Sequence, residues 1–209
     1  NFLSKENFQL SKNYFLVYSP ERENPVIKNF RQKFNFFNTP KICSGYSANC
    51  TKLGMLMYSK IIKTVIKADS IQSAEMSKIV ENIYRAANIG LVNELKMFCH
   101  KMNLDIHKVL KLAKTKPFGF TSFLPGPGIG GHCIPIDPYY LLDEAKKNNF
   151  KLNCVNESMI VNHKITRWCI KKIEKIFLKE KLRVNNIKIL FLGAAYKSNI
   201  DDLRESPAL

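Results

Sequence analysis

The sequence predicts an α/β protein in which short strands and helices alternate near the amino end, before a long helical stretch and a last strand. Three observations carry this prediction. Short apolar runs alternate with helical spacing over residues 14–68. A helical repeat without proline runs from about residue 69 to residue 116. A further apolar run covers residues 187–193. Strands that alternate with helices indicate α/β layers.

The first part of the chain is expected to hold three strands and one helix. Residues 14–18 are apolar and are closed by a Ser-Pro pair, which is typical of a buried strand. Residues 41–45 and 64–68 are two further strand candidates. Residues 47–62 have helical spacing between them. The apolar residues of that helix share one side: Leu53, Leu56, Met57 and Ile61.

The middle of the chain is expected to be mostly helical. Asp69 or Ser70 can cap a long helix, whose apolar residues recur at spacings of three and four. A break is expected near Gly90 or after His100, and residues 104–114 repeat the helical pattern.

The remaining elements are a shaped loop, a helix and a strand. Residues 117–140 are rich in glycine and proline but carry interleaved apolar residues, so we expect a structured loop and not a linker. Residues 157–179 are expected to form a helix. Residues 187–193 predict a buried strand that begins a new α/β unit.

Composition excludes some classes of protein and leaves the partner open. The chain has 209 residues, of which 45% are hydrophobic, so it is neither a disordered tail nor a small disulfide scaffold. Its 33 Lys and Arg against 17 Asp and Glu give a formal net charge of +16. This charge is compatible with nucleic acid, a membrane surface or a phosphorylated ligand, and equally with solvated lysines that bind no partner.

The cysteines favour a reducing, cytoplasmic setting. The six cysteines form no Cys-x-x-Cys pair, and no Cys/His spacing fits a zinc site. No secretory signal and no apolar run long enough to span a membrane is present. We therefore expect free thiols and no metal.

The glycine-rich segment 125–138 is the most informative stretch of the sequence. Its glycines formally satisfy Gly-x-Gly-x-x-Gly: Gly126, Gly128 and Gly131. The dinucleotide fingerprint also needs a strand before it and a helix after it. The residues before it make a poor strand, and Pro135 and Pro138 are expected to interrupt any helix. We therefore expect a glycine-lined pocket instead.

The same pocket is expected to present a nucleophilic cysteine. Glycine N–H groups and a neighbouring His can favour the thiolate of Cys133, and Asp137 follows four residues later. The alternative is a buried structural cysteine.

Polar residues on the long helix form a stripe within roughly 80° of arc: Lys78, Asn82, Arg85 and Asn93. Lys can stabilise an oxyanion, and Asn can position a water or hydroxyl. An ordinary solvated helix face explains the same pattern.

Two further candidates follow predicted strands. Glu21 comes after the first strand and could act as a general base, although a lone surface Glu is the alternative. Lys197 follows the last strand without a P-loop ending, and could contact a phosphate.

These stretches, in this order, resemble the UDP-glucose/GDP-mannose dehydrogenase family over about residues 14–209. The residues that carry the resemblance are 19–22, 74–95, 126–141 and 192–209. His132 and Ile136 make the cysteine segment most similar to the branch that oxidises UDP-N-acetyl-hexosamines, either UDP-N-acetylmannosamine or UDP-N-acetylglucosamine.

The resemblance implies a three-part organisation. Residues 1–70 would be the end of an NAD-binding Rossmann-like domain, and residues 71–182 a central helical domain that dimerises through the long helix and carries the catalytic residues. Residues 183–209 would hold the first strand of a truncated, UDP-binding Rossmann-like domain. The family's own Gly-x-Gly-x-x-Gly fold is absent from this sequence, so we expect the isolated chain to bind NAD poorly and not to turn over.

The resemblance also implies an activity, for surface polysaccharide precursor synthesis. NAD would oxidise the sugar C6 hydroxyl twice, through an aldehyde and a thioester on Cys133, to a uronate. Lys78 would stabilise oxyanions, Asn82 and Asp137 would position reacting groups and water, and Glu21 would be the general acid/base.

Substrate and cofactor contacts are implied in the same way. Arg204 would meet NAD. The UDP-sugar would lie against Leu124, Gly126, Gly128, Gly130, Tyr196 and Lys197. The chain departs from the usual pattern at Val26 and lacks the family's basic residues near Phe118 and Met159.

The expected partners are therefore a UDP-N-acetyl-hexosamine and a second copy of the chain, with neither nucleic acid nor a membrane. The alternative is a non-catalytic remnant or a basic protein that binds a polyanion. Its best patch lies at residues 171–188, which contain seven basic residues: Lys171, Lys172, Lys175, Lys179, Lys181, Arg183 and Lys188.

Overall fold

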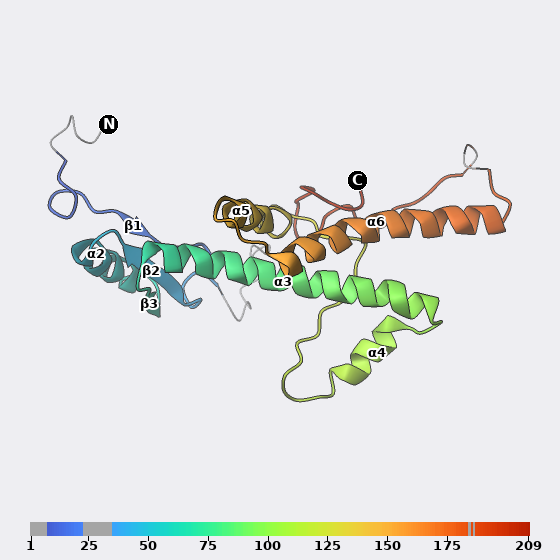
Figure 1. The fold of residues 1–209 in the computed structure, drawn as a ribbon, viewed down its shortest axis with the longest axis horizontal. Coiled ribbons are helices and arrows are strands. Elements are labelled where there is room, and N and C mark those ends of the chain that lie inside the picture. The colour runs from blue at the N-terminus through green and yellow to red at the C-terminus, as the bar shows by residue number, and fades with distance from the viewer. Residues whose placement is uncertain (1–7, 23–34, 184, 186) are drawn as a thin grey trace. The chain divides into compact units, whose positions relative to one another are not determined.

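The computed structural model describes residues 8–22, 35–183, 185 and 187–209, and it is a mixed α/β structure (Figure 1). The chain forms two compact units, residues 1–81 and residues 82–209. Helix α3 (Ile71–Lys101) belongs to both units, because the division falls within it. The predicted three-part division of the chain stays a prediction.

The first unit contains a three-stranded sheet, in which each predicted strand is present at least in part. The buried strand expected at residues 14–18 is wrong in extent and burial, because only Val17–Tyr18 pairs and Phe15 and Leu16 are exposed. Its strands are β1 (Val17–Tyr18), β2 (Lys41–Gly45) and β3 (Val65–Lys67), in the order β1-β2-β3. β1 pairs antiparallel with β2, whereas β2 and β3 are parallel. Helix α2 (Ala48–Ser59) connects the two parallel strands.

Helix α2 packs on the sheet through small residues. The Ser47 side chain caps the helix by accepting the N–H of Cys50 at 3.2 Å, and Cys50 is buried. A Cβ added at Gly54 would lie 2.6 Å from Val17 Cγ1 and 2.9 Å from Cys43 Sγ. This close approach places the predicted apolar side of the helix in solvent: Leu53, Leu56, Met57 and Ile61 are all exposed.

Helix α3 is continuous, so the break expected near Gly90 is wrong. Ser70 Oγ accepts the N–H of Ser73 at 3.0 Å and caps the start of the helix. Gly90 lies where α3 meets α6 (Asn153–Lys179): a Cβ there would lie 3.0 Å from the carbonyl oxygen of Ser158. The glycine therefore permits close helix packing and does not end α3. The second expected break, after His100, is confirmed by the end of the helix at Lys101.

A small apolar core joins the end of α3 to helix α4 (Ile106–Ala113). Its members come from both helices, with one loop residue packed against them: Val92, Cys99, Ile106, Leu110 and Phe123. This core lies where the chain turns back before the glycine-rich segment.

The prediction that prolines prevent a helix after the glycines is wrong. Helix α5 (Cys133–Lys147) begins directly after the loop and contains both Pro135 and Pro138. Pro135 lies in the first turn, where a backbone N–H has no helical partner to lose. Pro138 is buried and removes one hydrogen bond of the helix.

The expected strand at residues 187–193 is also wrong. These residues are irregular and their large side chains are exposed, as at Leu190, which is 83% exposed. A buried strand needs neighbouring strands, and no described strand pairs with this segment. The helix expected at residues 157–179 is confirmed, although α6 begins four residues earlier.

Candidate functional site

Cys133 is the exposed first residue of α5. The structure therefore excludes the alternative of a buried structural cysteine. The start of a helix presents free backbone N–H groups, which favour negative charge nearby. Position and exposure together leave this thiol accessible to a reagent or substrate.

The glycine loop that leads to Cys133 packs against the end of the chain. Gly128 and Gly131 have φ of +153° and +92°, which side chains rarely adopt. A Cβ at Gly130 would lie 2.3 Å from Tyr196 Cβ, so only glycine fits there. The Gly131 N–H donates to the Arg204 carbonyl at 2.9 Å. The structure thus places the Tyr196 side chain and the Arg204 backbone against the Cys133 loop, and the binding roles that the resemblance implies for them stay predictions.

The other end of the loop is fixed to α3. Asn93 is fully buried, and its Oδ1 accepts the Gly126 N–H at 2.9 Å. Its Nδ2 donates to Asn162 Oδ1 at 3.1 Å, and Asn162 Nδ2 donates to the Ala86 carbonyl at 3.0 Å. Asn93, a member of the predicted polar stripe, therefore makes its hydrogen bonds inside the protein and does not face a ligand.

The structure also brings Asp137 and Asn82 into contact, and the catalytic roles that the resemblance implies for them stay predictions. Asn82 Nδ2 donates to Asp137 Oδ2 at 2.5 Å. Asp137 lies four residues after Cys133 on α5, so both side chains are on the same helix face. The amide of Asn82 fixes the orientation of this carboxylate.

Lys197 and Arg85 lie near each other. Burial lowers the pKa of Lys197, and the positive charge of Arg85 lowers it further. Two neighbouring cations of this kind can bind a phosphate group, which would relieve their repulsion.

Arg204 is exposed and forms an ion pair with Asp202. Its Nη2 lies 2.7 Å from Asp202 Oδ2, and these hydrogen bonds lower the pKa of Asp202 to about 2. The same partner raises the pKa of Arg204, with smaller contributions from the charges of Tyr196 and Cys133.

Two predicted site residues belong to the first unit. Lys78 is partly buried and lies four residues before Asn82 on α3. Glu21 accepts the Arg22 N–H at 2.8 Å and pairs with the buried Lys41 at 2.9 Å. Their predicted catalytic roles stay predictions.

The last predicted substrate residue, Leu124, is exposed on the approach to the loop. Of the departures from the family pattern, Phe118 is exposed, Met159 is buried in α6, and Val26 lies outside the described residues.

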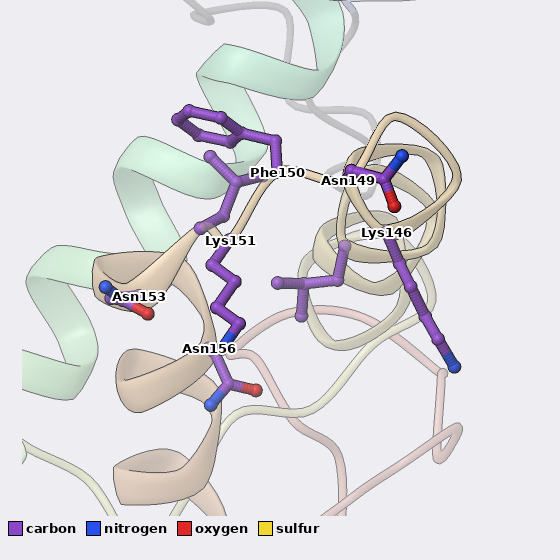
Figure 2. A pocket seen from close by; sticks show the side chains of 8 residues that line it. Lys146, Asn149, Phe150, Lys151, Asn153 and Asn156 are labelled. Atoms are coloured by element: carbon purple, nitrogen blue, oxygen red, sulfur yellow. The ribbon is translucent and has the colours of Figure 1, made fainter.

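The described residues of the second unit line hollows, among them two of similar volume. One, of about 460 Å³, lies beside the glycine loop and is lined by Ile129, Met159, Thr166, Arg167 and Pro207 among others. The other, of about 480 Å³, lies where α5 ends and α6 begins, with Lys151 extending toward Asn156 (Figure 2). None of the predicted site residues lines this second hollow.

Sequence reasoning missed residues that lie behind the loop. Asn162 and Thr166 lie on α6, and Thr166 Oγ1 donates to the Pro127 carbonyl at 2.7 Å. Only their spacing of one helical turn marks them in the sequence. Asp202 was missed as well, although it lies two residues from Arg204.

The described parts of the chain contain no complete motif for binding a metal ion or a dinucleotide. No group of three or more His, Cys, Asp or Glu there could bind a metal ion. The glycine loop follows irregular chain and not a strand, so it lacks the strand that dinucleotide binding needs. No described helix is long and apolar enough to cross a membrane.

Comparison with known proteins places this geometry in a family. Residues 72–164 match the central domain of the UDP-glucose/GDP-mannose dehydrogenase family. The chain is 34% identical over 199 residues to the UDP-N-acetyl-D-glucosamine 6-dehydrogenase of Pseudomonas aeruginosa, covering 95% of this chain and 46% of that protein. It is 31% identical to the UDP-N-acetyl-D-mannosamine dehydrogenase of Pyrococcus horikoshii, covering 94% and 45%.

Solved structures agree. A UDP-N-acetyl-mannosamine dehydrogenase from S. aureus matches 99% of this chain and 47% of that protein, with a TM-score of 0.78 and 30% identity. A UDP-ManNAc dehydrogenase from Pyrococcus horikoshii matches with a TM-score of 0.83 and 28% identity, over 94% and 45%. The chain therefore spans about half the length of its relatives. It belongs to the UDP-glucose/GDP-mannose dehydrogenase family.

Proposed function

We propose that this chain is the central, thiol-bearing part of an NAD-dependent UDP-N-acetyl-hexosamine 6-dehydrogenase. The relatives named above act on UDP-N-acetylglucosamine or UDP-N-acetylmannosamine by name, which supports this substrate class. The carrying observation is the exposed Cys133 at the start of α5, beside the carboxylate that Asn82 orients.

The proposed chemistry converts the sugar C6 hydroxyl to a carboxylate in two oxidations. NAD, when bound, accepts a hydride in each oxidation. Between them, the Cys133 thiolate adds to the C6 aldehyde and forms a carbon–sulfur bond; the second oxidation leaves a thioester. Water then breaks the carbon–sulfur bond, which releases the uronate and the free thiol.

The other residues of the second unit would bind and orient. Asp137, held by Asn82, would orient the attacking water. Lys197 would meet a phosphate of the UDP group, because a neighbouring anion would raise its pKa and so oppose the effects of burial and of Arg85. Arg204 would contact NAD. The loop at Leu124, Gly126, Gly128 and Gly130 would lie along the UDP-sugar with Tyr196.

We also propose that the chain dimerises through α3. Exposed apolar residues at helical spacing support this: Leu91, Leu95 and Phe98 share a face of the helix. Light scattering on the purified chain tests it, and a monomer at high concentration would contradict it.

A chimera tests the proposed activity. This chain would replace the matching 199 residues of the Pseudomonas aeruginosa relative, and NADH formation would be followed with both UDP-N-acetyl-hexosamines. We expect turnover that Cys133→Ser abolishes and Cys154→Ser does not. A folded chimera whose activity survives Cys133→Ser would contradict the proposal.

The isolated chain gives a second test. Because its described residues contain no dinucleotide motif, we expect no NADH formation from the chain alone. Clear turnover would show that the cofactor is bound by residues other than those proposed.

A further inference from the structure

We propose that helix α6 positions the Cys133 loop through Asn162 and Thr166, which makes these two side chains positioning residues of the site. The inference deepens the proposed function and shares its nucleophile, Cys133. It rests on two separate contacts, both within residues 82–209.

The first contact runs through the buried asparagine pair. Asn162 Oδ1 accepts from Asn93, whose own Oδ1 accepts the Gly126 N–H at 2.9 Å. Asn162 also donates to the Ala86 carbonyl, which fixes its amide from the other side. Because Asn93 and Asn162 are both buried, leaving either group unpaired is costly, so the orientation of each is fixed.

The second contact is direct. Thr166 Oγ1 donates to the Pro127 carbonyl at 2.7 Å, and a Cβ at Gly128 would lie 2.7 Å from the same oxygen. Thr166 therefore both bonds to the loop and limits the space at Gly128. Asn162 and Thr166 are one helical turn apart, so one face of α6 holds consecutive loop residues.

The loop is thereby anchored at both ends. At its start, Thr166 of α6 holds Pro127 directly, and Asn162 of α6 holds Gly126 indirectly through Asn93 of α3. At its end, the Arg204 carbonyl holds Gly131. Cys133 follows two residues after the last anchor. Removing an α6 contact should therefore loosen the loop and disturb the first turn of α5, where the thiol lies.

Thr166→Val and Thr166→Ser form the matched test pair. Valine keeps the shape but removes the hydroxyl, whereas serine keeps the hydroxyl. Two quantities would be measured on the whole chain by peptide mass spectrometry: amide hydrogen exchange over residues 126–132, and iodoacetamide labelling of Cys133 relative to the exposed Cys154. Neither needs NAD or a UDP-sugar, so failure here is distinct from failure of the proposed function.

For Thr166→Val we expect loop exchange to rise about five-fold, the factor that one ordinary hydrogen bond represents. Cys133 labelling should slow relative to Cys154, because the thiol loses its place at the ordered start of α5. Thr166→Ser should restore both values. Asn162→Leu should act in the same direction and more strongly.

Two outcomes would overturn the inference. One is loop exchange in Thr166→Val equal to that of the wild type. The other is faster exchange with an unchanged labelling ratio, because Thr166 would then hold the loop without positioning Cys133. If Asn162→Leu fails to fold, the Thr166 pair alone decides.

Discussion

The contact between Gly130 and Tyr196 makes a sharp prediction for Gly130→Ala. The added Cβ would lie 2.3 Å from Tyr196 Cβ and 3.0 Å from the Glu205 carbonyl oxygen. Carbon atoms pack at about 3.5–4.0 Å, so the segment that carries Tyr196 must move away by more than about 1 Å. Trimming Tyr196 to alanine would not relieve the clash, because alanine keeps Cβ.

The magnitude follows from two opposing effects. Overpacking costs about 1–3 kcal/mol. Alanine also restricts the unfolded chain more than glycine does, which by itself raises the free energy of unfolding by about 0.4–1 kcal/mol. Gly130 is not among the glycines with positive φ, so no backbone strain is added. We therefore expect a net loss of about 1–2 kcal/mol in the free energy of unfolding, measured with urea.

Gly126→Ala is the matched control, because its nearest contact would be 3.7 Å away and its φ is not positive. It should change stability by less than about 0.5 kcal/mol. Gly130→Ala should also raise amide exchange over residues 194–207. Equal stability and exchange in wild type and Gly130→Ala, or equal damage from both variants, would refute the reasoning.

Three further predictions follow from single contacts. Gly54→Ala should lower the free energy of unfolding by about 1–3 kcal/mol, because its Cβ would meet Val17 and Cys43. Leu53→Ala on the exposed side should lower the free energy of unfolding by less than about 0.5 kcal/mol. Urea unfolding of the two variants compares these values. Arg204→Gln should raise the pKa of Asp202 from about 2 toward 3.8, seen by NMR titration of the carboxyl carbon, and an unchanged value would contradict the ion pair. In the wild type this pairing is present above about pH 4 and is lost as the pH falls toward the folded pKa. Arg85→Gln should raise the pKa of Lys197 in an NMR lysine titration, and no rise would show that burial alone lowers it.

Local patterns predicted most helices and the small sheet, because strand and helix periods are set by nearby residues. They failed where the answer depends on packing partners. Residues 187–193 have the composition of a buried strand, but no described strand pairs with them. In α2, periodicity located an apolar side but could not show that the helix meets the sheet through the small residues Cys50, Thr51 and Gly54.

The candidate site could be predicted where the type of a residue indicates the chemistry that it can perform. Cys133 is exposed, Asn82 contacts Asp137, and Tyr196 lies against the loop. The roles expected for these residues stay predictions. Asn93 was expected in a ligand-facing stripe, but a helical wheel does not show which polar residue is buried. Asn162 and Thr166 were missed because their role depends on α6 lying behind the loop.

The central claim is that the Cys133 thiol adds to a sugar C6 aldehyde. The most direct measurement uses the C6 aldehyde of UDP-N-acetylglucosamine, which needs no oxidant for this step, and follows iodoacetamide labelling of each cysteine peptide. The account predicts that the aldehyde protects Cys133 and leaves Cys154, which is also exposed, unprotected, and that Asn82→Ala weakens the protection. Equal protection of both cysteines, or none of Cys133, would contradict it.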